Sequence, residues 1–180
     1  MPSELDSLLA QLSQSQAAFL RAADAISPDD WKTKPSDGRW SAAELVAHLT
    51  MVEQAVIDKA DRVSQNSPKR IPFFKKMHLP MVLVERRLVR RKSPVPIDPA
   101  LLGDKEAMLA RLRVVRERSL AFLEETRDRS LREYCWQHPA IGMLNTYGWM
   151  RFVAAHEARH TKQMREIASD LPKAIESLQK

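Results

Sequence analysis

Two histidines four residues apart, His156 and His160, flank a glutamate in the sequence HEARH. The pattern H-E-x-x-H on a helix is typical of zinc metalloproteases, in which both imidazoles bind the ion and the glutamate, here Glu157, acts as general base. Residues four apart share one face of a helix with their β-carbons about 5–6 Å apart, so both rings can reach one ion. The spacing alone is weak evidence, because a single histidine in an apolar row is more often a hydrogen-bonded core residue.

A third histidine, His48, interrupts the apolar row of a second expected helix, in a chain with five histidines in all. Three buried imidazoles without a shared partner would leave several ring nitrogens unsatisfied, at about 1–3 kcal/mol each. One metal ion satisfies a nitrogen of each ring, and three protein ligands leave a position open for water or substrate, as in catalytic sites. We therefore predict that His48, His156 and His160 bind one divalent ion. Zinc is the expected metal, with nickel, iron and manganese as alternatives.

Two other metal sites fit the sequence less well. A zincin protease needs a third ligand after the motif and an exposed sheet edge for its peptide. No histidine follows His160 in the sequence. The acidic residues that do follow, Glu166, Asp170 and Glu176, could be third ligands only by residue type. We also expect no strand before the motif. A ferritin-like di-iron bundle needs two Glu-x-x-His pairs, and only Glu157 with His160 forms one.

The elements that must position these histidines are helical. The chain has only four glycines and little strand-type alternation, whereas apolar residues recur at helical spacing. We expect four helices over residues of about 3–26, 41–63, 104–129 and 145–172. The second start is the best marked, because Ser41 and Glu44 form a capping box flanked by Trp40 and Leu45. The third helix should bury Met108, Leu112, Val115, Phe122 and Leu123.

The long gap between the second and third helices, about residues 65–103, is rich in proline and poor in periodicity, with room for a short helix from about Met81 to Arg91. A connection of this length is a crossover rather than a tight hairpin turn. The sequence thus predicts an all-α four-helix bundle, with residues 1–180 as a single domain.

The positive charge is concentrated in this gap. Nine of the 29 Lys and Arg residues, but one of the 23 acids, lie between Lys69 and Lys92. We interpret this basic segment as a solvated crossover, whose apolar residues could cover the bundle or a neighbouring subunit, which leaves a homodimer open. No groove-reading motif or aromatic stacking platform accompanies the charge, so we expect no specific nucleic-acid partner. Positive charge here could attract a small thiol that carries carboxylates.

The remaining composition indicates a soluble cytoplasmic protein without a membrane partner. One cysteine, Cys135, excludes an internal disulfide, and no stretch predicts a signal peptide or a membrane span. We interpret Cys135 as a small, partly buried apolar residue and not as a nucleophile.

Three motifs together resemble a known family: W-S-x-x-E-L-x-x-H-L from Trp40, H-P-x-x-G-x-L-x-x-x-x-W from His138, and H-E-x-R-H-x-x-Q from His156. The combination is similar to the DinB-like, or YfiT-like, superfamily of metal-dependent enzymes, over nearly the whole chain. The resemblance implies an up-down-down-up bundle with a long crossover between helices 2 and 3. It also implies that His48, His156 and His160 are the metal ligands.

The same resemblance implies the class of reaction. Characterised relatives include thiol-dependent S-transferases and a mycothiol-dependent isomerase, so a low-molecular-weight thiol is the leading cosubstrate for a small-molecule substrate. Hydrolysis by a metal-activated water is the first alternative, and a non-catalytic helical binding module is the second alternative. A metal that exchanges a ligand would distinguish the enzymes from the module.

Other polar residues near the motifs have weaker claims. Glu157 is a candidate base, although its position favours a surface or edge charge, and Arg159 is similarly ambiguous. Gln163 and Glu53 could orient the imidazoles, or simply make solvent or interhelical contacts. Trp136 and His138 are expected in the loop before the fourth helix, at the rim of the pocket, where simple packing or exposure is the first expectation for each.

Overall fold

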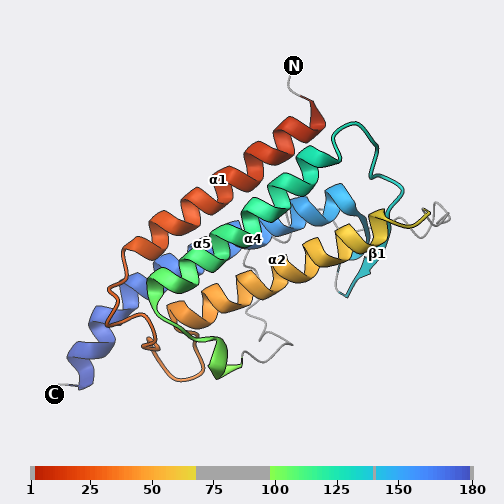
Figure 1. Ribbon diagram of the computed structural model, residues 1–180. Coiled ribbons are helices and arrows are strands. Elements are labelled where there is room, and N and C mark those ends of the chain that lie inside the picture. The colour runs from red at the N-terminus through yellow and green to blue at the C-terminus, as the bar shows by residue number, and fades with distance from the viewer. Residues whose placement is uncertain (1–2, 68–97, 140, 179–180) are drawn as a thin grey trace.

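The computed structural model describes residues 3–67, 98–139 and 141–178. These described residues form a four-helix bundle with one small hairpin of two strands (Figure 1), which confirms the predicted fold class. The helices are α1 (Glu4–Asp24), α2 (Ala42–Ser64), α4 (Lys105–Glu125) and α5 (Thr146–Leu178), with a short 3₁₀ helix η2 (Pro99–Leu101) before α4. The strands are β1 (Cys135–His138) and β2 (Gly142–Asn145).

Capping boxes begin both helices of the first half of the chain. The Ser3 hydroxyl accepts from the backbone N–H of Asp6 in α1, and the Asp6 carboxylate accepts from the Ser3 backbone. In α2 the Ser41 hydroxyl accepts from Glu44 N at 3.2 Å, while Glu44 Oε2 accepts from Ser41 N at 2.8 Å. Two N–H groups that lack helical partners are satisfied each time, which places the start of each helix at the predicted residue.

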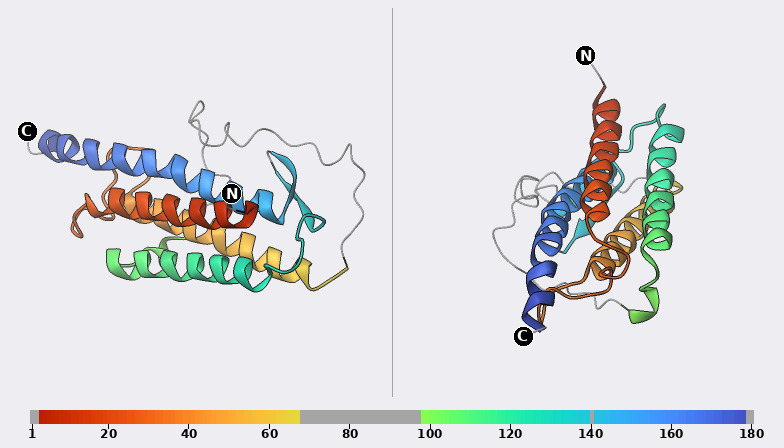
Figure 2. Two further views of the ribbon diagram at one scale, coloured as in Figure 1. Left: turned by 90° about the horizontal axis from the view of Figure 1, so that it is seen from above. Right: turned by 90° about the vertical axis from the view of Figure 1, so that its left-hand side faces the viewer.

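The four helices run in the up-down-down-up order that the family resemblance implies. The first and last helices are parallel neighbours, α2 and α4 are a second parallel pair running the opposite way, and α2 also packs on α5 (Figure 2). Parallel neighbours cannot be joined by a tight turn, so α2 and α4 need the long connection from Gln65 to Asp104. The predicted short helix and the basic segment, Lys69 to Lys92, lie outside the described residues.

The core consists of two apolar clusters along the bundle axis. One includes Phe19, Trp31, Leu45, Leu112 and Ile167, and the other includes Leu8, Leu12, Ile57, Leu123 and Met150. All five residues predicted to face inward from the third helix are buried. On α2 the buried Glu53 lies between the residues of the two clusters, and on α5 the buried Glu157, His160 and Thr161 do the same.

The hairpin was not expected, and the prediction that no strand precedes the histidine motif is wrong. Cys135 to His138 pair antiparallel with Asn145 to Gly142, and β2 leads directly into α5. Gly142 has a φ of 111°, a conformation that favours glycine. Trp136, expected in a loop, lies in β1, where its carbonyl accepts from Trp149 Nε1 at 3.2 Å and its ring stacks on Trp149. Strands of four residues are too short for a periodic signal, and contacts with α5 stabilise them.

The last helix continues beyond Pro172, where the sequence predicts an end. A proline removes one helical hydrogen bond and disfavours the helical conformation of the preceding residue. The residues after it still donate their own N–H groups, and most residues from Lys173 to Leu178 are good helix formers. The prediction therefore gave too much weight to a single proline.

None of the helices in the described ranges combines the length and the apolar character that crossing a bilayer requires.

Candidate metal centre

The three predicted histidines come together from two helices. His48 lies in the second turn of α2, seven residues after the Ser41 cap, between the buried residues Ala47 and Leu49. His156 and His160 lie one turn apart on α5, which packs against α2. The helical period turns all three towards the α2–α5 contact, where His160 is buried and the other two rings are half-buried.

The Nε2 atoms of the three rings converge on one point. Nε2 of His156 lies 3.3 Å from Nε2 of His48 and 3.1 Å from Nε2 of His160, and the three ligand atoms all lie within 4.8 Å of one another. Nitrogens bound to a single zinc ion at about 2.0–2.1 Å in tetrahedral geometry are about 3.3 Å apart. The spacing therefore fits three ligands of one small ion, and these are the three residues that the sequence selected.

Hydrogen bonding among the imidazoles alone leaves this cluster incomplete. Nδ1 of His160 lies 3.0 Å from Oε1 of Gln163, and an amide oxygen only accepts, so the proton of the neutral ring is on Nδ1 and the lone pair on Nε2. Nε2 of His156 carries either one hydrogen or one lone pair, so it can complete only one of its two contacts. A cation accepts a lone pair from each ring and removes the conflict, so the donor set fits a metal ion.

The surroundings of His48 and His156 favour their uncharged forms at neutral pH. Burial lowers the pKa of His48 from 6.5 to about 4. Burial also lowers the pKa of His156 well below its usual value, and the neighbouring charges of His160, His48 and Arg159 add to this effect. Neutral imidazole is the form that binds a metal, so the apolar setting makes lone pairs available without a competing proton.

Aromatic rings line the cluster. Trp40, which precedes α2, has its ring centre 5.0 Å from that of His48 and 6.2 Å from that of His160. Phe152, one turn before His156, stacks on that ring at 5.2 Å. The imidazole of His138 packs edge-on against Phe152 at 4.6 Å. Aromatic rings therefore pack against all three imidazoles of the cluster.

The remaining histidine of the described chain lies one aromatic ring away from the cluster. Nδ1 of His138 accepts from the backbone N–H of Ile141 at 3.1 Å, and burial lowers the pKa of His138. The ring is half-buried and packs on Trp149 and Phe152, as the packing interpretation expected, although in a strand and not in a loop. Cys135 is half-buried at the start of β1, and His78 lies outside the described residues.

The two glutamates near the motifs face away from solvent, and the prediction of a surface or edge position for Glu157 is wrong. Glu157 is 1 % exposed, and its Oε2 accepts from Arg116 Nη2 at 3.0 Å and from the Ser15 hydroxyl at 2.5 Å. Glu53, considered as a partner of the imidazoles, instead accepts two hydrogen bonds from Arg116. The interhelical alternative for Glu53 is therefore the correct one, whereas Gln163 does contact His160.

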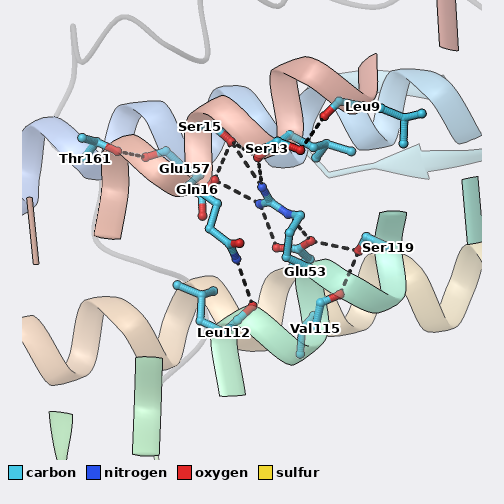
Figure 3. A network of polar contacts seen from close by, with 12 residues as sticks. Leu9, Ser13, Ser15, Gln16, Glu53, Leu112, Val115, Ser119, Glu157 and Thr161 are labelled. Carbon is cyan, nitrogen blue, oxygen red and sulfur yellow. Dashed lines mark hydrogen bonds and ion pairs between the residues drawn. The ribbon is translucent and has the colours of Figure 1, made fainter. Parts of the chain in front are cut away.

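Sequence reasoning missed Arg116, which donates to both Glu53 and Glu157. Figure 3 labels these two glutamates within the buried polar network. Burial opposes the charge of Arg116, but the hydrogen bonds and charges of Glu53 and Glu157 outweigh this and raise the pKa of Arg116. Burial likewise raises the pKa of Glu157, and Arg116 and Ser15 counteract it. The helical spacing was a usable signal. Arg116 lies four residues and Ser119 seven residues after Leu112, so both occupy the inward row of α4.

Comparisons with known proteins agree with this fold and motif set. The profile of the DinB superfamily matches residues 11–164. The chain is similar to the uncharacterized protein YuaE of Bacillus subtilis (strain 168), with 28% identity over 152 residues, covering 83% of this chain and 90% of that protein. Among solved structures it is similar to TT2238, a four-helix bundle protein, with a TM-score of 0.55 and 21% identity, covering 90% of this chain and 98% of the other.

Proposed function

The chain belongs to the DinB superfamily, and from this premise we propose that it is a metal-dependent enzyme whose single divalent ion is bound by His48, His156 and His160. One observation carries the proposal: the Nε2 atoms of His48 and His160 lie 3.3 Å and 3.1 Å from that of His156, the spacing of three ligands of one small ion. Gln163 supports the site by holding His160 in the tautomer that presents Nε2.

Zinc is the metal we propose, because the donor set consists of neutral imidazoles, with nickel, iron and manganese as alternatives. When bound, the ion supplies Lewis acidity that makes a water or a thiol nucleophilic at neutral pH. Three protein ligands leave a coordination position for that group. His48, His156 and His160 would hold the ion, and the rings of Trp40 and Phe152 pack against the imidazoles of His48 and His156.

We propose a thiol-dependent transfer as the reaction, on the strength of the family resemblance. The sulfur of a low-molecular-weight thiol forms a bond to an electrophilic carbon of a small substrate, and the leaving group departs with the electron pair of the broken bond. The thiol proton passes to solvent. Glu157 is not assigned the role of base here, because its Oε2 is bound by Arg116 and Ser15 within the core.

The decisive experiment compares metal-depleted protein with protein reloaded with Zn²⁺, Ni²⁺, Fe²⁺ or Mn²⁺. Each form is given a cysteine-based thiol together with electrophiles such as a chlorodinitrobenzene, and thiol loss and thioether formation are both measured. We expect turnover only with metal and thiol present, and its loss in His156→Ala. Turnover of activated esters without thiol would indicate the hydrolase. No turnover of either kind, with a metal that exchanges no ligand, would indicate a binding module.

A further inference from the structure

One guanidinium connects all four helices in the middle of the bundle. Arg116 of α4 donates to Glu53 of α2 through Nε at 2.7 Å and Nη2 at 3.0 Å. Nη2 also donates to Glu157 of α5 at 3.0 Å. Nη1 donates to the backbone carbonyl of Leu12 and, at 3.4 Å, to the hydroxyl of Ser15, both in α1. Figure 3 shows Glu53, Glu157 and Ser15 meeting between the helices.

The network is buried and almost fully paired. The side chains of Arg116, Glu53 and Glu157 are 1 %, 3 % and 1 % exposed. The Ser119 hydroxyl donates a further hydrogen bond to Glu53 at 2.9 Å. Among the side chains that the structure describes, Glu157 Oε1 is the one buried polar atom without a hydrogen-bond partner. A guanidinium is planar with donors in a rigid fork, so these contacts specify both the distance and the rotation of the helices they connect.

Stability alone is a poor explanation for such a network. Replacing a buried ion cluster with apolar residues of similar volume is often neutral or stabilising, because desolvation offsets much of the attraction between the charges. Two carboxylates share one guanidinium here, and one carboxylate oxygen lacks a partner, so the arrangement is not the most favourable way to fill a core. A role in fixing the relative positions of the helices would explain why Arg116, Glu53 and Glu157 are buried here in place of apolar residues.

The helices that the guanidinium connects are the helices that share the histidines. Glu157 is the residue after His156, and Glu53 follows His48 by five residues, about 7.5 Å along the α2 axis. The contact between His48 and His156 and the link from Glu53 through Arg116 to Glu157 therefore both connect α2 with α5. A shift of α2 relative to α5 that broke one would misplace the other.

We propose that Arg116 is a positioning residue of the histidine site: by holding Glu53 and Glu157 together, it sets the spacing of α2 and α5 at which His48 meets His156 and His160. The inference rests on the proposed metal site. It assigns the network a function in metal binding, since a metal tolerates only small errors in the placement of its ligands. Arg116 touches neither the ion nor the substrate and acts only through the helices.

The test uses Co²⁺ as a spectroscopic probe in three variants of the full chain. Arg116→Lys keeps the charge but loses the fork. The triple variant Glu53→Leu, Arg116→Met and Glu157→Leu removes the network while keeping the core filled. Leu131→Ala is the matched control, because Leu131 is fully buried in the connection after α4 and takes no part in the network. Co²⁺ affinity, the visible absorption bands of bound Co²⁺, and thermal stability are measured for each.

We expect both network variants to bind Co²⁺ about 10- to 100-fold more weakly than the wild type, with altered absorption bands, as when groups that orient metal ligands are lost. Leu131→Ala should lose stability but keep the affinity and spectrum of the wild type. Network variants that bind within twofold of the wild type, with unchanged bands, would overturn the proposal. So would failure of both to fold, since the network would then support the whole bundle. If the wild type binds no Co²⁺ or Zn²⁺, the proposed function itself fails, and this inference with it.

Discussion

Nδ1 of His160 lies 3.0 Å from Oε1 of Gln163, one turn further along α5. This contact selects the tautomer of His160 and aims its Nε2 at His156. Gln163→Leu should therefore weaken Zn²⁺ binding by about 10- to 100-fold, the usual cost of removing such a partner. Competition with a chromophoric chelator measures the affinity. Gln163→Glu keeps an acceptor and should bind at least as tightly as the wild type, and equal affinity in all three proteins would show that the contact is irrelevant.

The ligand set predicts one divalent ion per chain. His48→Ala, His156→Ala and His160→Ala should each reduce affinity by more than about 100-fold, because each removes a ligand and not merely its support. His138→Ala and His78→Ala are the matched controls and should keep the stoichiometry of the wild type, as determined by elemental analysis after dialysis. Comparable losses in all five variants would contradict the three-ligand assignment.

The metal-free protein should lose stability as the pH falls from about 6.5 to about 4. Burial lowers the pKa of His48 to about 4, so the unfolded state binds more protons than the folded state in this range, and stability rises with pH. His48 alone contributes about 3 kcal/mol to this change. Urea unfolding in the presence of a chelator, at a series of pH values, measures it.

His48→Leu is the variant that isolates this effect. It removes one titrating ring while keeping an apolar side chain, so the dependence of unfolding free energy on pH should become shallower between pH 4 and 6.5. His156 changes the slope in the same direction, since its pKa is also lowered by burial, and should account for much of what remains. If the unfolding free energy of His48→Leu and of the wild type depends on pH with the same slope, folding does not lower the pKa of His48.

Cys135 should be dispensable for the reaction. It lies at the first position of β1, opposite Asn145, and its Sγ contacts the carbonyl of Arg132 at 3.5 Å. Cys135 is not part of the cluster of ligand atoms formed by His48, His156 and His160. Cys135→Ser should keep the full metal-dependent rate in the thiol-transfer assay, and a loss greater than about tenfold would require a mechanism with a protein thiol.

Much of the local structure was predictable from short-range signals. Ser41 and Glu44 mark the start of α2 through a capping box that needs only residues three apart. The apolar row of α4, from Met108 to Leu123, follows the helical period and is buried as predicted. His48, His156 and His160 were identifiable because a histidine is unusual in an apolar row. A single metal ion is one explanation that fits all three.

The remaining features depend on contacts between distant residues. The helical period shows that Arg116, Glu53 and Glu157 can face inward, but it does not show that they meet, since they come from three helices whose relative rotation is set by packing. The hairpin from Cys135 to Asn145 likewise has too few residues per strand for a pattern and depends on Trp149 and α5. The sequence by itself determined which residues form helices and which three histidines stand out in them. Only the tertiary structure decided which charges are buried together, because burying a charge is favourable only where packing brings its partner.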